Sequence, residues 1–94
     1  MATFAVTYSY GAPNDVLDQI RPTHRAYLSS FLEEGVLLAS GPYVGVHGAL
    51  LIFRADSAKE VADLLDKDPF HVAGYIAERT ITEWNPIFGP WSAA

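Results

Sequence analysis

The sequence predicts an α+β protein in which strands and helices follow one another in the order β-α-β-β-α-β. Three observations support this order: two-residue alternation near both ends of the chain, helical stripes of apolar residues in two places, and Gly or Pro between the segments. The order is that of the ferredoxin-like fold. All 94 residues are expected to form a single domain, with its core over 3–84 and an irregular, Pro- and Gly-containing tail over 85–94.

The first half of the chain predicts a strand, a helix and a second strand. Residues 3–10 alternate between large and small side chains, which is the period of a strand. Residues 16–20 could form one helical turn, but a proline suits the first turn of a helix. The first helix is therefore expected over 22–34, and Gly35 ends it. The apolar run 36–40 then predicts the second strand.

The second half predicts two more strands with a helix between them. Gly41-Pro42 is expected to end the second strand, residues 43–47 are expected to form a loop, and the apolar segment 48–55 predicts the third strand. The second helix is expected to follow a capping residue at position 56 or 57. It should stop near position 67, because a proline disfavours helical geometry in the residue before it, Asp68. Loose alternation over 75–84 predicts the fourth strand.

These elements define one antiparallel sheet. A right-handed crossover makes the first two strands parallel, and the short connection that follows turns the third strand back. The expected order of strands is 4-1-3-2, with both helices on one face. The other face is expected to carry Ala5, Thr7, Leu51 and Phe53 or their alternates. Such a face is too apolar to remain in water, so a second sheet is expected against it, and a homodimer would supply one.

The composition argues against several classes of protein. The chain has no cysteine, which rules out disulfides, thiol nucleophiles and zinc–thiolate sites and favours a cytoplasmic protein. Neither a signal peptide nor a membrane span is expected. The net charge of −5 and the six dispersed Lys and Arg residues are unlike those of a nucleic-acid-binding protein. The expected partners are therefore a small-molecule ligand and further copies of the chain, as a homodimer or a higher homo-oligomer.

The predicted topology brings all three histidines to one edge of the sheet. His24 lies four residues before Leu28 on the apolar stripe of the first helix, and Asp68 lies four after Leu64 on that of the second. Buried polar groups need partners, so these two side chains are expected to pair as a general acid/base dyad. A simpler interpretation stays open, in which His24 binds a backbone carbonyl and Asp68 only caps the turn before Pro69.

Five further residues near this edge are expected to bind substrate: Arg21, Pro42, Tyr43, Phe70 and His71. Arg21 would hold an anionic group, although a solvated residue before the helix is the favoured interpretation, and Tyr43 and Phe70 could be ordinary core. A metal bound by His71 with the dyad is not expected, because the compact helical spacing of metal motifs is missing. No Gly-rich phosphate loop or nucleophile elbow occurs, so no cofactor is expected.

Four short motifs occur in order between the first strand and Trp84: Arg21-Pro22-Thr23-His24, Gly35, Gly41-Pro42 and Asp68-Pro69-Phe70. Together they resemble the YCII-related proteins. The resemblance implies a dimeric α+β barrel of two ferredoxin-like subunits, and a catalytic His and Asp that correspond to His24 and Asp68. One branch of that family removes chloride from a chlorinated hydroxyhydroquinone. His71 and the tail as far as Trp91 lie outside these motifs, so the resemblance supplies no substrate.

The predicted function is that of a cofactor-independent enzyme, lyase- or isomerase-like, in which His24 and Asp68 move a proton on a small oxygenated, aromatic substrate. Two alternatives remain. The first is a non-catalytic ligand-binding or accessory domain, in which the two residues only satisfy a buried edge. The second is a haem- or metal-dependent oxygenase, because other dimeric α+β barrels use haem.

Overall fold

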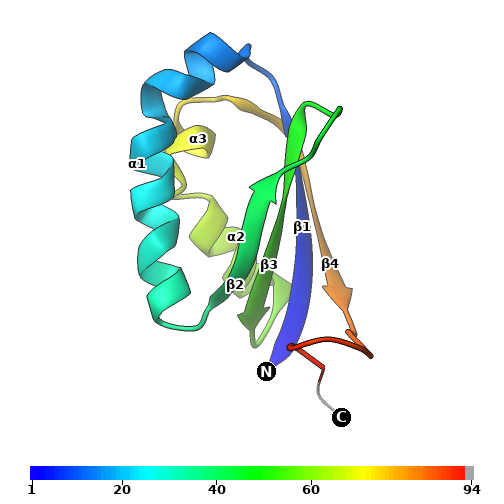
Figure 1. Cartoon of the computed structure of the whole chain (residues 1–94). Helices are drawn as coiled ribbons and strands as arrows, with labels where there is room; N and C mark the ends of the chain where they lie inside the picture. Colours follow the sequence, from blue (N-terminus) through cyan, green and yellow to red (C-terminus); the bar gives the residue numbers. More distant parts are fainter. Residues whose placement is uncertain (93–94) are drawn as a thin grey trace.

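The computed structural model describes residues 1–92 and contains the predicted strands and helices together with one more short helix (Figure 1). The four strands form one antiparallel sheet in the order β2-β3-β1-β4, which is the predicted order seen from the other edge. The chain therefore has the ferredoxin-like α+β fold. Among the described residues, no helix is both long enough and apolar enough to cross a bilayer. The elements are β1 (Ala2–Tyr10), α1 (Asn14–Glu33), β2 (Leu37–Pro42), β3 (Gly48–Ala55), α2 (Ala58–Leu65), α3 (Pro69–Val72) and β4 (Ile76–Trp84).

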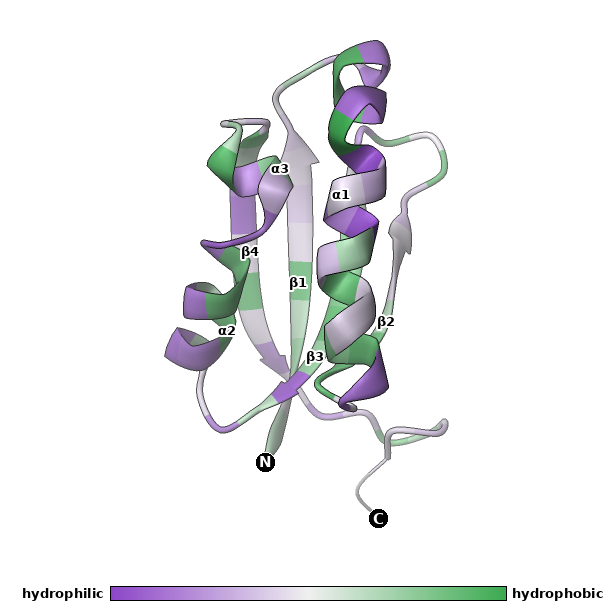
Figure 2. Cartoon of the chain, turned by 90° about the vertical axis from the view of Figure 1, so that its left-hand side faces the viewer, coloured by the Kyte–Doolittle hydropathy of each residue, from purple (hydrophilic) through white to green (hydrophobic). Residues whose placement is uncertain are grey.

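The hydrophobic core lies between the helices and one face of the sheet. Figure 2 looks onto the helical layer, with α1 over the β2 side of the sheet and α2 over the β4 side. Alternate residues of β1 and β3 point into this layer, and their burial supplies about 1.5–3 kcal/mol for each large apolar side chain. The most deeply buried of them are Phe4, Val6, Tyr8, Leu51 and Phe53.

The sequence left open whether Leu51 and Phe53 or their alternates lie on the free face of the sheet, and the structure places the alternates there. Phe53 is paired with Phe4 across β3 and β1, so both side chains share the face that the helices cover. Their alternates, Leu50 and Ile52, take the opposite face. Leu50 remains 36% exposed there, whereas Ile52 is only 5% exposed.

Helix α1 begins at Asn14 rather than at the predicted Pro22, which lies inside it. The turns of α1 before Pro22 are stabilised by packing of Leu17, which is completely buried. Figure 1 shows the first part of α1, in blue, inclined to the cyan remainder, and a proline that lacks its N–H is a common cause of such a bend. Because the helix starts early, Arg21 and His24 belong to one continuous helix.

The β2–β3 hairpin approaches the end of β1 closely. Strand β2 continues through Gly41 and Pro42, which the sequence predicts to end it; an edge strand tolerates a proline. At the start of β3, a Cβ on Gly48 would lie 2.2 Å from the carbonyl oxygen of Tyr8. Any residue other than glycine at this position would therefore push the hairpin away from β1.

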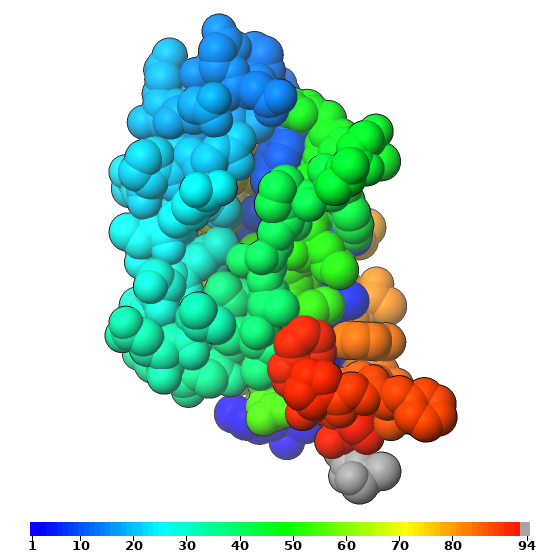
Figure 3. All heavy atoms as spheres, in the orientation of Figure 1, coloured from blue at the N-terminus to red at the C-terminus, as the bar shows by residue number. Residues whose placement is uncertain are grey.

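The residues after β4 fold back along the sheet. Residues 85–92 contain no helix or strand, and Figure 3 shows this red segment across the lower end of the molecule. Pro86 is buried, whereas Phe88 is 91% exposed. The last two positions of the predicted tail, 93 and 94, lie outside the described residues.

Candidate active site

The carboxylate of Asp68 is the centre of the candidate site and is completely buried at the start of α3. Its Oδ1 accepts a hydrogen bond from the backbone N–H of Phe70 at 3.0 Å and lies 2.7 Å from Nδ1 of His24. Its Oδ2 accepts a hydrogen bond from the Tyr8 hydroxyl at 2.8 Å. Donors from α1, α3 and β1 therefore surround the carboxylate, as a buried charge requires.

The imidazole of His24 is held on two sides. Because an ionised carboxylate only accepts hydrogen bonds, Nδ1 carries the proton that it donates to Asp68. The ring also stacks on Phe70, with centroids 4.0 Å apart and planes inclined by 15°. These contacts fix the tautomer and the ring orientation, and they leave Nε2 as the nitrogen that can take up or deliver a proton.

Tyr8 is a third member of this cluster. Burial, followed by the negative charge and the hydrogen bond of Asp68, raises the pKa of Tyr8 far above its ordinary value. The hydroxyl therefore stays protonated and remains a donor at any working pH. The sequence interpretation left Tyr8 as core or interface, although a tyrosine at an inward position of a strand needs a partner for its hydroxyl.

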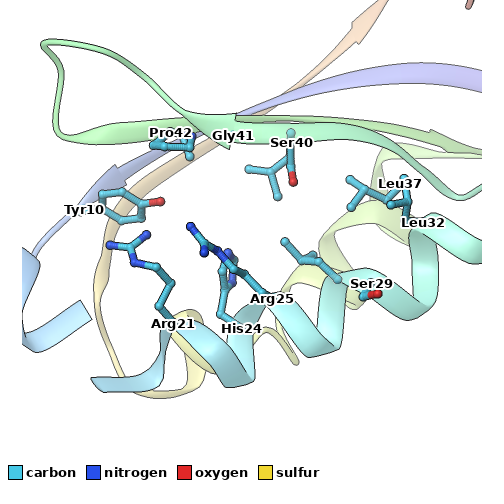
Figure 4. A pocket seen from close by; sticks show the side chains of 13 residues that line it. Tyr10, Arg21, His24, Arg25, Ser29, Leu32, Leu37, Ser40, Gly41 and Pro42 are labelled. Atoms are coloured by element: carbon cyan, nitrogen blue, oxygen red, sulfur yellow. The ribbon is translucent and has the colours of Figure 1, made fainter. Parts of the chain in front are cut away.

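The dyad opens into a cavity of about 190 Å³ between α1 and the β2–β3 hairpin. Figure 3 shows the surface hollowed between the blue and cyan spheres of α1 and the green spheres of the hairpin. Figure 4 shows Arg21, His24 and Arg25 extending from α1 toward β2 across this space. The far part of the wall is apolar and includes Leu28 and Leu37. The cavity thus combines a proton-transfer group, two cations and a hydrophobic wall.

Two of the five predicted substrate-binding residues, Arg21 and Pro42, line this cavity with His24. Phe70 is completely buried beneath the His24 ring and supports it from behind. Tyr43 lies on the outer side of the hairpin, where its hydroxyl is 3.2 Å from Oγ1 of Thr7. Tyr43 also lines a neighbouring hollow that shares Arg21 with the cavity.

His71 is not among the residues that line the cavity. Its Nε2 lies 3.7 Å from Asp66, which also accepts a hydrogen bond from Arg79 at 2.5 Å. His71 sits in the last turn of the short helix α3, three residues beyond the cap, and the sequence interpretation did not include that helix. Its neighbours are therefore on the α2 and β4 side of the molecule.

The third histidine has a structural contact. Nε2 of His47 donates to the backbone carbonyl of Ala12 at 2.6 Å, and its ring packs edge-on against Tyr10 at 5.2 Å. This contact ties the hairpin loop to the turn before α1, beside the mouth of the cavity. Among residues 1–92, no group of three or more His, Asp or Glu side chains is placed to hold a metal ion.

Arg25 is the charged residue of the cavity that the sequence interpretation missed. It lies next to His24 in the chain and four residues after Arg21. This spacing places Arg25 on the same side of a continuous helix as Arg21. It was missed because the helix was expected to start at Pro22, which left Arg21 outside the helix.

Two solved enzyme structures are similar to this chain. The 5-chloro-2-hydroxyhydroquinone dehydrochlorinase of Burkholderia phenoliruptrix AC1100, in complex with 2,5-dihydroxybenzoquinone, superposes with a TM-score of 0.77. The two are 26% identical over 88% of this chain and 93% of that enzyme. A muconolactone isomerase superposes with a TM-score of 0.72 over 98% of this chain and 95% of the isomerase. Its 17% identity supports the fold alone.

Sequence comparison gives the family. No curated protein sequence is significantly similar to this chain. The family model of the YCII-related domain, however, matches residues 3–85, from the first strand to just beyond the last. That match includes every residue of the dyad and all the predicted substrate-binding residues. The chain belongs to the YCII-related family.

Proposed function

We propose that the protein is a small-molecule enzyme, lyase- or isomerase-like, in which Nε2 of His24 transfers a proton. The observation that carries this proposal is the 2.7 Å contact between His24 Nδ1 and the buried carboxylate of Asp68, at a cavity large enough for a small ring. Asp68 orients the imidazole and stabilises the imidazolium that forms when Nε2 accepts a proton.

The chemistry needs no redox partner. Nε2 removes a proton from an O–H or an acidic C–H of the substrate, and the electron pair left behind enters the substrate's conjugated system. In an elimination, a leaving group such as chloride then departs with its bonding pair, and the imidazolium releases the proton to solvent. In an isomerisation, the imidazolium returns the proton to a different atom. Both outcomes are balanced and use His24 first as base and then, in the second case, as acid.

The proposed substrate is a small oxygenated aromatic compound. The resemblance to a dehydrochlorinase that acts on a chlorinated hydroxyhydroquinone supports this class. The apolar wall formed by Leu28 and Leu37 would pack against a ring, whereas His24 and the arginines would face its oxygen atoms.

A non-catalytic ligand-binding domain is the second candidate, and one observation favours it. Asp68 already has a structural role, because Oδ1 caps α3 through the Phe70 amide and Oδ2 satisfies the buried Tyr8 hydroxyl. The pair with His24 could then serve only to complete this network.

Turnover assays distinguish these two candidates. The substrates to test are 5-chloro-2-hydroxyhydroquinone, with chloride release as the measurement, and related hydroxylated ring compounds and lactones. For an enzyme, His24→Ala should lower the rate about 100-fold or more, the usual contribution of a general acid/base. Thr23→Ala is the matched control, because Thr23 is the exposed neighbour of His24 on α1 and should leave the rate unchanged. A wild-type protein that binds these compounds but converts none of them would favour the binding domain.

We also propose that the protein forms a homodimer through the free face of its sheet. Leu50 is 36% and Trp84 is 42% exposed, and the face they belong to is not covered by a helix. Two such faces packed together would remove these apolar side chains from water.

A further inference from the structure

The mouth of the cavity concentrates positive charge in an otherwise acidic protein. The chain has six Lys and Arg residues and a net charge of −5. Two of these six, Arg21 and Arg25, line the same cavity as His24, and Figure 4 shows both side chains extending into it from α1. No carboxylate is among the described residues that line this cavity. The local charge is therefore opposite in sign to that of the whole molecule.

The two guanidinium groups are only partly neutralised. Nε of Arg21 donates to Asp18 at 2.9 Å, but that carboxylate is 65% exposed and lies outside the lining of the cavity. Within residues 1–92, Arg25 makes no ion pair with any carboxylate. Like charges four residues apart on a helix repel each other, and Asp18 pairs with Arg21 alone, so an anion bound near both guanidinium groups would stabilise them.

Neighbouring groups hold Arg21 in place beside His24. Its guanidinium carbon lies 5.7 Å from the centre of the Phe70 ring, the same ring on which His24 stacks. Tyr10, which also lines the cavity, lies close enough to Arg21 for the cation to oppose the rise that burial causes in the pKa of Tyr10. The position of Arg21 relative to the dyad is therefore set before any ligand binds.

We propose that Arg21 and Arg25 form an oxyanion-binding subsite, so that the natural ligand carries a carboxylate or an acidic ring oxygen on an apolar body. The planar fork of a guanidinium matches such an oxyanion with paired hydrogen bonds. The apolar body would lie against Leu28 and Leu37, on the deeper wall. This assignment rests on the proposed function, since it names the substrate class for the same site.

The subsite also has a consequence for proton transfer. When Nε2 of His24 removes a proton, the negative charge moves onto the oxygen atoms of the ligand. Arg21 and Arg25, which line the cavity beside His24 on the same helix, would face that charge. Fixed cations that face a developing charge stabilise the transition state more than the ground state.

Binding of simple anions to the full chain tests the subsite without any turnover. Benzoate represents the carboxylate, 2,5-dihydroxybenzoquinone represents the acidic ring oxygen, and benzamide is the neutral counterpart of benzoate. Isothermal titration should show that at least one of the two anions binds roughly ten-fold or more tightly than benzamide, since charge-assisted hydrogen bonds are at stake. Which anion binds more tightly identifies the source of the oxyanion.

Variants assign the effect to the arginines. Arg25→Gln should weaken binding of the preferred anion about 10- to 100-fold and leave benzamide unchanged. Arg25→Lys keeps the positive charge but lacks the planar guanidinium, so it should give an intermediate loss of affinity for the anion. Lys59→Gln is the control, because it also removes one positive charge, while Lys59 lies on α2 with an 83% exposed side chain, outside the cavity, and should not change binding. Arg25 is exposed, so its replacement should leave the fold intact.

The subsite is overturned if neither anion binds saturably at millimolar concentration, if benzamide binds as tightly as benzoate and the quinone, or if Arg25→Gln retains full affinity. These outcomes are separable from a failure of the proposed function. Loss of turnover in His24→Ala with no effect of the arginine variants would leave proton transfer standing and remove the subsite. Normal turnover in His24→Ala, together with binding that depends on the arginines, would keep the subsite and remove the proposed proton transfer by His24.

Discussion

At the scale of single residues, Asp68 has more hydrogen-bond partners than the sequence could indicate. The inward phase of His24 and Asp68 predicts their pairing, and the two atoms lie 2.7 Å apart. Nothing in the spacing shows that Tyr8, sixty residues away in sequence, binds the second carboxylate oxygen. Such a contact depends on the register of β1 against its neighbours, and periodicity alone does not give register.

Tyr8 should make stability depend on pH in the alkaline range. In the unfolded chain its hydroxyl ionises near pH 10.0, whereas burial and Asp68 raise its pKa in the folded protein. The folded state then keeps a proton that the unfolded state loses, so the contribution of Tyr8 is complete below pH 10 and declines as the pH rises above it. The decline is at most about 1.4 kcal/mol per pH unit.

Tyr8→Phe should abolish this part of the decline. Urea unfolding just below pH 10 and about one unit above it measures the difference between wild type and variant. The other tyrosines are present in both proteins, so the difference isolates Tyr8. Equal pH slopes for the two proteins would show that the Tyr8 hydroxyl does not hold its proton more firmly in the folded state.

At the scale of elements, the sequence predicts which helices and strands exist better than it predicts where they begin. Pro22 is a reasonable first residue for a helix, yet α1 starts at Asn14 because burial of Leu17 holds the turns before the proline. Helix α3 is a single turn, too short to show an apolar period. These two differences explain why Arg25 and the surroundings of His71 were not foreseen.

The caps of α2 and α3 should separate stability from function. Oγ of Ser57 accepts a hydrogen bond from the Glu60 amide at 3.2 Å and touches nothing in the cavity. Ser57→Ala should therefore cost about 1 kcal/mol in the free energy of unfolding and leave turnover unchanged. Asp68→Asn also removes a capping group, but it should in addition slow turnover by on the order of 100-fold, because an amide does not stabilise imidazolium. If Asp68→Asn only lowers stability, as Ser57→Ala does, the dyad is structural.

At the scale of the whole molecule, the free face of the sheet sets the expected assembly. Its apolar residues on β3 are Leu50 and Ile52, because Leu51 and Phe53 belong to the core, and Leu50 and Trp84 remain partly in solvent. A mixed face of this kind suits an interface between subunits that are each already folded.

Leu50→Glu should convert the expected dimer into a monomer, because it places a charge in the centre of the packed sheets. Sedimentation velocity at micromolar concentration measures the change. Val72→Glu is the control, since Val72 is 72% exposed on α3, on the helical side of the molecule, and should leave the dimer intact. A wild-type protein that sediments as a monomer at this concentration would contradict the proposed interface.

The Phe70 amide offers a direct view of the site. Its proton is donated to the same carboxylate oxygen that lies next to Nδ1 of His24. Exchange of that proton with solvent requires its hydrogen bond to the carboxylate to break, so its exchange rate measures how often the Asp68 cap opens in the native protein. Amide exchange at this one position thus makes the local stability around the carboxylate of the dyad observable in solution, without a substrate and without a mutation.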